Sequence, residues 1–357
     1  MAPAFVPALE LSAAFYREVV EPLLAGRPHA AALLGWGSDV LGYDTPRSTD
    51  HGWGPRLLVL LPHGQDPTGW DVRLDASLPQ EFRGWPVRYG WDGLPSQHRV
   101  TVTTLPAWCR EHLGVDATSG LSTLDWLTVP QSRLLGVVAG RVHADHDGAL
   151  TAVRRELAWY PDQVWRWLLA CQWRRVAQEE AFVARTAEVG DETGSAITAA
   201  RQAREVVRLA LLLSRRYAPY PKWLGTAFAR LEHGDDLPAQ VHAAVHAQDA
   251  DQREGALAAA YRSVARRHNA AGLTRPVDPE VRAYHSRPAQ VLLAERFVEA
   301  SLEVVTDPWL RSLPLVGAVD QVVDSTDALT DPQVWRRLAA VYGPAPGRPS
   351  SAAPGPP

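Results

Sequence analysis

The stretch that decides the fold runs from residue 31 to residue 61, AALLGWGSDVLGYDTPRSTDHGWGPRLLVLL. It begins and ends with apolar runs of strand length, residues 31–34 and 57–61. The connection between them contains several glycines and Pro46, which are typical of turns. Short apolar runs bounded by turn residues predict two buried strands joined by a polar connection.

The first turn of this connection carries a glycine-serine pair, Gly37-Ser38. Because glycine has no Cβ, backbone N–H groups and the serine hydroxyl can approach phosphate oxygens closely at such a turn. Asp50 stands before the second strand, and Mg²⁺ prefers carboxylate and phosphate oxygens as ligands. The sequence therefore predicts Gly37 and Ser38 as phosphate-binding residues of a nucleotide site, with Asp50 as a catalytic metal ligand.

Gly37-Ser38, a spacer, and Ser48-Thr49-Asp50 ahead of an apolar strand resemble the nucleotidyltransferase signature of the DNA polymerase β superfamily. The chain more closely resembles the bacterial "domain of unknown function 4037" family. The matching blocks, in order, are GWGSDVLGYDTPRSTDHGWGPRL, LAWYPDQVW, GDETGSAITAARQAREVV, RYAPYPKW and GAVDQVVDSTD. The resemblance covers residues 9–327 and implies a nucleotidyltransferase-like domain with a helical partner, but no settled substrate.

The sequence departs from the superfamily signature at the second carboxylate. In an Asp-x-Asp pair both side chains face the same side of the strand, because side chains alternate. Here Gly52 stands two residues after Asp50, and the predicted strand 99–104 carries no carboxylate. Asp44 or Asp39, from the loop, are the alternatives for a further metal ligand.

Two functional hypotheses follow from the resemblance and this departure. The first is Mg-dependent transfer of a nucleotidyl group from an NTP, with ATP expected, to a small-molecule acceptor. The second is a catalytically inactive nucleotide-binding or interaction protein of the same fold. The purely structural alternative is a glycine-rich turn between two core strands, with Asp50 as a cap at the strand entry.

The composition is that of an ordinary globular protein. The chain has 357 residues, 46% hydrophobic and 21% charged, which is long enough for two domains. A net charge of −4 gives no general attraction to nucleic acid or anionic membranes, so neither is expected as a partner. No apolar run approaches the ~18 residues of a membrane span.

Compartment and source are inferred from composition. Cys109 and Cys171 lack metal-ligand spacing and are expected to be reduced, buried thiols. The N-terminus lacks the features of a signal peptide, so a cytoplasmic location is expected. Lys222 is the only lysine, and the many Arg, Ala, Gly and Pro residues are typical of a GC-rich bacterial genome.

The order of elements predicts an α/β domain followed by an all-α domain. A helix over 12–24, the strands named above and a helix over 107–113 predict a small mixed sheet in residues 1–145. The polar loop 140–148 is the expected boundary; its two His and two Asp make a metal site the alternative. Residues 146–341 are expected to be helical, and the Pro/Gly-rich tail 342–357 to be disordered.

Helical periodicity dominates the second domain. A long helix to about residue 189 and a second one over 197–216 are expected to pack antiparallel at the centre of a bundle. Buried tryptophans at helical spacing, such as Trp167 and Trp173, are expected to fill the core. Further helices are predicted over 223–231, 237–246, 252–267, 289–303 and 332–341.

Four residues of the helical domain are candidates for the site. Asp191 and Glu192, at the break between the two long helices, could act as a general base, or could form an acidic first turn stabilised by the helix dipole. Arg201 could clamp a phosphate or pair with those acids. Lys222, beside two aromatic residues, could bind phosphate as a point charge or be a solvated lysine.

Overall fold

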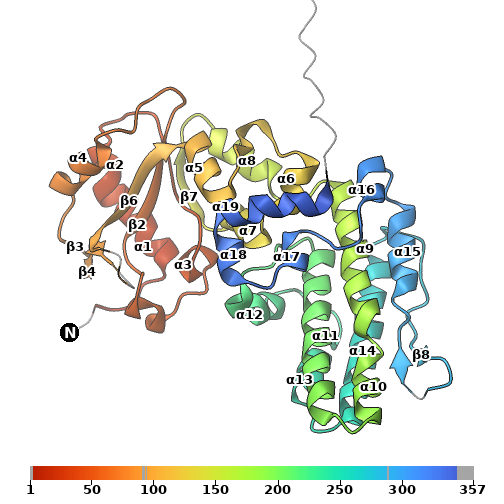
Figure 1. Cartoon of the computed structure of the whole chain (residues 1–357). Helices are drawn as coiled ribbons and strands as arrows, with labels where there is room; N and C mark the ends of the chain where they lie inside the picture. Colours follow the sequence, from red (N-terminus) through yellow and green to blue (C-terminus); the bar gives the residue numbers. More distant parts are fainter. Residues whose placement is uncertain (1–2, 91–92, 94, 288, 344–357) are drawn as a thin grey trace, which may run out of the picture. The chain divides into compact units, whose positions relative to one another are not determined.

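The computed structural model describes residues 3–90, 93, 95–287 and 289–343. The chain forms two compact units. Unit 1 comprises Met1–Leu121 and Gln131–Ala158, and unit 2 comprises Ser122–Pro130 and Trp159–Pro357. Unit 1 contains a small mixed sheet and unit 2 is helical, which confirms the predicted fold class (Figure 1). From residue 344 onward the predicted tail lies outside the described residues.

Unit 1 is built around a mixed sheet whose strand order, within the described residues, is β5-β6-β2-β1-β7. The strands are β1 (Ala30–Leu33), β2 (Arg56–Leu61), β5 (Arg88–Tyr89), β6 (Gln97–Thr104) and β7 (Arg141–Asp145). β2 and β6 are parallel, and the other neighbours are antiparallel. The strands predicted over 31–34, 57–61 and 99–104 are thus confirmed, with small shifts at their ends.

Different helices cover the two faces of this sheet. The helices of unit 1 are α1 (Ala8–Phe15), α2 (Glu21–Leu23), α3 (Ser38–Leu41), α4 (Trp70–Ser77), α5 (Leu105–Leu113), α7 (Gln131–Val138) and α8 (Ala149–Glu156). Leu57 and Val59 belong to a core shared with α1 and α4, whereas Leu58 and Leu60 line cavities beside α5, α7 and α8. Burial on both faces explains the unbroken apolar runs of β1 and β2.

The first helix is irregular. α1 continues into a π-helical turn, Tyr16–Val20, and then into α2, so the helix predicted over 12–24 is confirmed and begins earlier. A π-helical turn contains more residues than an α-helical turn and changes which side chains face the sheet. Here Tyr16 is buried and Arg17 is exposed.

The prediction of an inter-domain loop over 140–148 is wrong. Residues Arg141–Asp145 form β7, which pairs with β1 at one edge of the sheet. Residues 142–145 of this strand are all half-buried, and the polar residues among them, His143 and Asp145, hid the strand in the sequence. The two units divide at Ala158 and Trp159 instead of at residue 145, and the segment Ser122–Pro130 groups with unit 2.

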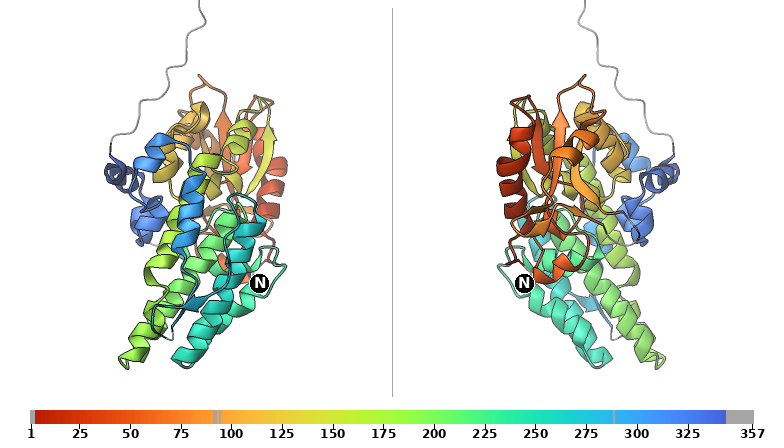
Figure 2. Two further views of the ribbon diagram at one scale, coloured as in Figure 1. Left: turned by 90° about the vertical axis from the view of Figure 1, so that its right-hand side faces the viewer. Right: turned by 90° about the vertical axis from the view of Figure 1, so that its left-hand side faces the viewer.

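Unit 2 is a bundle of helices. They are α6 (Thr123–Thr128), α9 (Asp162–Glu179), α10 (Phe182–Glu188), α11 (Glu192–Leu213), α12 (Leu224–Ala229), α13 (Leu237–His246), α14 (Ala250–Ala270), α15 (Glu295–Glu303), α16 (Pro308–Ser312), α17 (Val319–Val322), α18 (Thr326–Thr330) and α19 (Pro332–Trp335). α11 packs against α9, α13 and α14, and the long helices run side by side (Figures 1 and 2). Trp165, Trp167 and Trp173 of α9 are buried in this bundle, as their spacing predicts.

Two predicted helix boundaries in unit 2 are wrong for a shared reason. α9 ends at Glu179, short of residue 189, and α15 begins at Glu295 instead of residue 289. At the break the buried carboxylate of Glu180 accepts hydrogen bonds from the backbone N–H groups of Leu292 (2.7 Å) and Ala294 (2.9 Å). A contact between segments so distant in sequence has no local sequence signal.

Among the described residues, no helix has the length and apolar character needed to cross a membrane. Cys109 and Cys171 are both free and buried, as predicted.

Candidate functional site

An acidic residue in the turn after β1 forms an ion pair with a basic residue at the start of β2. Asp39, the second residue of α3, is buried, and its Oδ2 lies 2.7 Å from Nη2 of Arg56 at the start of β2. The same Nη2 donates to the carbonyl of Trp36 at 2.8 Å. Burial raises the pKa of Asp39 because the loss of hydration outweighs the attraction of Arg56. The glycine-serine turn and the second strand are therefore joined by a buried ion pair.

Gly37 makes room for this ion pair. Its φ is +115°, a conformation that side chains rarely adopt, and a Cβ there would lie 2.2 Å from Oδ1 of Asp39. The space that a side chain at position 37 would fill is thus occupied by the carboxylate of Asp39. Ser38 is half-buried at the start of α3, and its hydroxyl has no hydrogen-bond partner within the described part of the chain.

Asp44, a predicted metal ligand, has a structural role. Its Oδ2 accepts hydrogen bonds from the backbone N–H of Ala8 (2.8 Å) and from Nε1 of Trp53 (3.0 Å). These bonds attach the loop to the first turn of α1 and to a core tryptophan.

Asp50, the predicted catalytic metal ligand, is exposed at the end of a 3₁₀ turn, Pro46–Asp50. Its Oδ1 lies 2.7 Å from Nδ1 of His51, and its Oδ2 lies 3.7 Å from Nε of Arg47. The hydrogen bond from His51 is the main reason that the pKa of Asp50 is lowered. Asp50 is therefore ionised and open to solvent. Gly52 stands at the position of the second carboxylate in the superfamily signature. Its φ is +61°, in the left-handed region that favours glycine.

These carboxylates do not assemble a magnesium site. Asp39 is paired with Arg56, Asp44 is hydrogen-bonded to N–H donors, and Asp50 contacts its own neighbours. Within the described residues, no group of three or more His, Cys, Asp or Glu side chains is placed to hold a metal ion. These three carboxylates are therefore not brought together as one set of metal ligands.

A cavity of about 200 Å³ lies beside the same turn, on the face of the sheet covered by α5 and α7. Two arginines, Arg56 and Arg133, and two tryptophans, Trp36 and Trp108, are among its lining residues. Trp36 is 53% exposed, and the guanidinium of Arg56 lies 5.4 Å from the centre of its ring. The Nε of Arg56 is buried and has no hydrogen-bond partner among the described residues.

Close backbone contacts between the end of β1 and α7 lie next to this cavity. The N–H of Gly35 donates to the carbonyl of Gly136 in α7 at 2.9 Å. A Cβ at Gly136 would lie 2.2 Å from the oxygen of Gly35 and 2.8 Å from Nε2 of His112. At Gly140 a Cβ would lie 2.0 Å from the oxygen of Leu33. Glycine at these two positions lets the end of β1 approach α7.

The cavity is lined by two arginines and one carboxylate, Glu111, and its histidine is neutral. His112 stacks on Trp108 with ring centres 5.0 Å apart, and its Nε2 lies 2.9 Å from the carbonyl of Arg133. Burial, followed by the nearby charge of Arg133, lowers the pKa of His112 to about 3. Burial also lowers the pKa of Arg133, but a guanidinium remains charged in proteins. The sequence analysis missed Trp108, His112 and Arg133 because no motif spacing connects them.

In unit 2, Asp191 and Glu192 have structural partners. Oδ1 of Asp191 accepts from the N–H of Gly194 at 2.7 Å and caps α11. Glu192 forms an ion pair with Arg253 of α14, whose Nε donates to Oγ of Ser195 at 3.0 Å. Asp191 is thus the N-cap of α11 and Glu192 lies in its first turn, where the helix dipole stabilises an acid.

The two predicted phosphate-binding cations of unit 2 also have local contacts. Nε of Arg201 lies 3.0 Å from Oε2 of Glu179, a partner that the sequence analysis did not consider. Nζ of the exposed Lys222 lies 5.0 Å from the centre of the Trp223 ring. A cation–π contact of this kind stabilises an exposed lysine by about 0.5–1 kcal/mol without any ligand.

The His and Asp side chains of 143–147 bind different partners. Nε2 of His143 lies 3.0 Å from Oγ of Ser12, and Nδ1 of His146 lies 2.6 Å from the carbonyl of His29. Oδ2 of Asp145 accepts from the N–H of Thr151 at 2.7 Å. These side chains fix β7 and the start of α8.

The comparisons with known proteins support the family resemblance over part of the chain. The model of the family "Domain of unknown function (DUF4037)" matches residues 126–224, which confirms the predicted similarity there. The match includes α9 and α11 and does not include residues 31–61.

In structure the chain is similar to a nucleotidyltransferase-like protein from Exiguobacterium sibiricum 255-15. The TM-score is 0.34 and the sequence identity 12%, over 85% of this chain and 91% of that chain. A likeness at this level identifies neither a substrate nor a reaction. No curated protein matches the chain in sequence.

Proposed function

We propose that unit 1 binds a nucleotide at the cavity lined by Trp36, Arg56 and Arg133. The observation that carries this proposal is the presence of two guanidinium groups and two indole rings around one cavity. A guanidinium binds phosphate oxygens through its fork of N–H donors, and an indole face stacks on a base. Nucleotide binding is the function this combination of groups supports best.

The unpaired donor of Arg56 supports a ligand at this cavity. A buried polar group left without a partner costs about 1–3 kcal/mol, so an oxygen bound at this Nε would recover that cost. Pockets that enclose a drug-sized ligand measure roughly 300–1,000 Å³, and this cavity is smaller at about 200 Å³. In the proposed pose the cavity holds the phosphate end, and the base stacks on the exposed face of Trp36.

The test is calorimetric titration of the full chain with ATP and with GTP. Trp36→Ala is expected to weaken binding about ten-fold, because stacking of one base on an aromatic ring is worth about 1–3 kcal/mol. Trp36→Phe keeps an aromatic face and should retain most of the affinity. Arg155→Met, which removes an exposed arginine outside the cavity, is the charge control. Equal affinities for Trp36→Ala and the wild type would refute the proposed pose.

Nucleotidyl transfer from an NTP to a small-molecule acceptor, with Mg²⁺ as cofactor, is the second candidate. The exposed, ionised carboxylate of Asp50 favours it, since an accessible carboxylate is the residue type that such chemistry requires. The experiment is to measure pyrophosphate release from each NTP with Mg²⁺ and a panel of hydroxyl-bearing acceptors. Asp50→Asn should abolish any release, whereas Asp71→Asn, at another exposed aspartate, should not. Binding without release leaves the first proposal standing and removes the second.

A further inference from the structure

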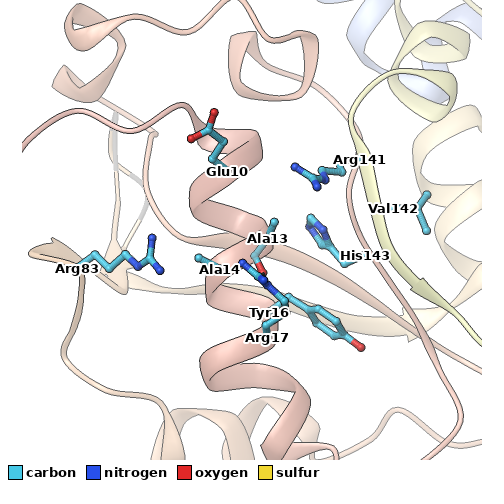
Figure 3. A pocket seen from close by; sticks show the side chains of 9 residues that line it. All are labelled: Glu10, Ala13, Ala14, Tyr16, Arg17, Arg83, Arg141, Val142 and His143. Atoms are coloured by element: carbon cyan, nitrogen blue, oxygen red, sulfur yellow. The ribbon is translucent and has the colours of Figure 1, made fainter.

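A second cavity of unit 1, about 400 Å³ in volume, is rich in arginine. We call it the basic pocket and define it by Glu10, Tyr16, Arg17, Arg83, Arg141 and His143. Figure 3 shows Arg83 on one side of the helix that carries Glu10 and Arg17, and Arg141 and His143 on the other side. It shares no lining residue with the cavity beside Trp36. Its volume is within the range of small-molecule sites.

The charges of this pocket are incompletely balanced. Nη2 of Arg83 pairs with Oε1 of Glu18 at 2.6 Å. Neither Arg17 nor Arg141 forms an ion pair within the described part of the chain, and Arg17 donates only to the carbonyl of Ala13, at 3.3 Å. Two of the three guanidinium groups are therefore available to an anion. Glu10, at the same pocket, is the only lining carboxylate among the described residues.

The charges of Arg17 and Arg141 both act on His143, a residue that lines the pocket. His143 is half-buried, stacked on Tyr16 with ring centres 5.7 Å apart, and its Nε2 lies 3.0 Å from Oγ of Ser12. Burial is the main cause that lowers the pKa of His143 to about 4, and the charges of Arg141 and Arg17 lower it further. The imidazole is therefore neutral at physiological pH and adds no charge to the pocket.

Two backbone irregularities position pocket residues. Tyr16 and Arg17 begin the π-helical turn, a feature found frequently at functional sites. Arg83 lies in the turn between β3 (Glu81–Phe82) and β4 (Trp85–Pro86) with φ +52°, a left-handed conformation that costs a non-glycine residue about 1–2 kcal/mol. In this turn the arginine side chain reaches the pocket at the cost of local backbone strain.

We propose that the basic pocket binds the phosphate group of a small phosphorylated molecule. A phosphate monoester carries about −1.5 to −2 charge at neutral pH and offers three strong acceptor oxygens, which suits two unpaired guanidinium groups and a third beside them. The volume left beyond the phosphate accommodates an organic part. This proposal is independent of the nucleotide proposal.

The experiment is calorimetric titration of the full chain with inorganic phosphate, with glycerol phosphate as a simple monoester, and with citrate as a carboxylate competitor. Arg141→Met should weaken phosphate binding about ten-fold or more, because a hydrogen bond to a charged group is lost. Glu10→Gln should tighten it, because a repelling carboxylate is removed. Arg155→Met, at an exposed arginine outside both cavities, should leave it unchanged.

Arg17→Met provides a second test if Arg141→Met does not fold, since Arg17 is exposed and its only bond is to a nearby carbonyl. Tighter binding of glycerol phosphate than of inorganic phosphate assigns the organic part to the pocket. The proposal is overturned if the wild type binds neither phosphate ligand at millimolar concentration, if citrate binds as well as phosphate, or if Arg141→Met and Arg155→Met bind phosphate equally.

Discussion

Two buried carboxylates, Glu205 of unit 2 and Asp39 of unit 1, each face arginine and respond in opposite ways. Oε2 of Glu205 lies 2.9 Å from Nε2 of Gln172 and 3.0 Å from Nε of Arg175, and its Oε1 lies 3.1 Å from Nη2 of Arg204. Burial alone would raise the pKa of this carboxyl, but these donors reverse the shift, so its pKa is lowered.

The buried carboxylate of Asp39 has fewer side-chain donors than that of Glu205. One guanidinium, that of Arg56, pairs with it, and Arg56 divides its donors between this carboxylate and the carbonyl of Trp36. The pKa of Asp39 is raised, since burial outweighs the single ion pair. The comparison teaches that burial and an arginine neighbour do not by themselves distinguish a structural ion pair from a functional one. Glu205 has three side-chain donors from Gln172, Arg175 and Arg204, whereas the unit 1 pair has one arginine and borders a cavity.

Glu205→Gln should have the largest effect on stability. Its charge compensates two arginines, so removing it should lower the free energy of unfolding by about 3 kcal/mol at neutral pH. Because the folded pKa of Glu205 is lowered, its contribution is present above the unfolded pKa and is lost as pH falls through the folded pKa. Urea denaturation at several pH values measures this. Glu303→Gln, at an exposed pair with Arg275, should change little.

Glu180→Gln sharpens the comparison, because Glu180 is buried and satisfied by backbone N–H groups. Burial raises its pKa to about 7 against these hydrogen bonds. The stability it contributes is therefore present below its unfolded pKa, near 4.5, and is lost as pH rises through about 7. Glu180→Gln should remove a pH-dependent change on the order of 2–3 kcal/mol across this window. Glu179→Gln, the adjacent control, should retain that dependence.

Gly136→Ala tests whether the unit 1 cavity depends on close backbone packing. The added Cβ would meet backbone oxygen at 2.2 Å, so α7 must move from the turn after β1. We expect a loss of about 2 kcal/mol in the free energy of unfolding, together with weaker nucleotide binding. Gly225→Ala, where nothing lies within 4 Å of the added Cβ, is the matched helical control. An unchanged unfolding midpoint for Gly136→Ala would show that the contact is not required.

Asp39→Asn should have the smallest effect and completes the comparison with Glu205→Gln. Because the folded pKa of Asp39 is raised, its stabilising contribution is already lost as pH rises to neutrality. The neutral isostere should therefore change the free energy of unfolding by less than about 1 kcal/mol at pH 7. A loss as large as that of Glu205→Gln would remove the distinction between the two ion pairs.

The local sequence pattern predicted most helices and strands correctly, but it did not predict which other segments they pack against. The strands that flank Gly37 followed from apolar runs, and the buried tryptophans of α9 followed from helical spacing. The π-helical turn at Tyr16 and the role of Gly136 in α7 had no local signal, because each depends on what packs against it. The strand β7 was missed because three of its five residues, Arg141, His143 and Asp145, are polar.

The candidate site shows the same division. The sequence pointed to the turn at Gly37-Ser38, and the structure places the cavity, the buried ion pair and the unpaired donor beside that turn. It also pointed to Asp50, with Asp44 or Asp39 as a further metal ligand, and in the structure Asp39 is the carboxylate that pairs with Arg56. Three neighbouring aspartates of one loop look alike in sequence, since burial and partners are set by the packing around each.

The sequence by itself determined the buried strands at both ends of the glycine-serine connection, the mixed α/β and helical halves, and the position of the glycine-serine turn. These features depend on the alternation of apolar residues and on backbone preferences, which act over a few residues. Only the tertiary structure decided which charges are compensated and which arginines remain available to a ligand. That outcome depends on groups brought together from distant segments, where burial and the number of donors set the ionisation of each carboxyl.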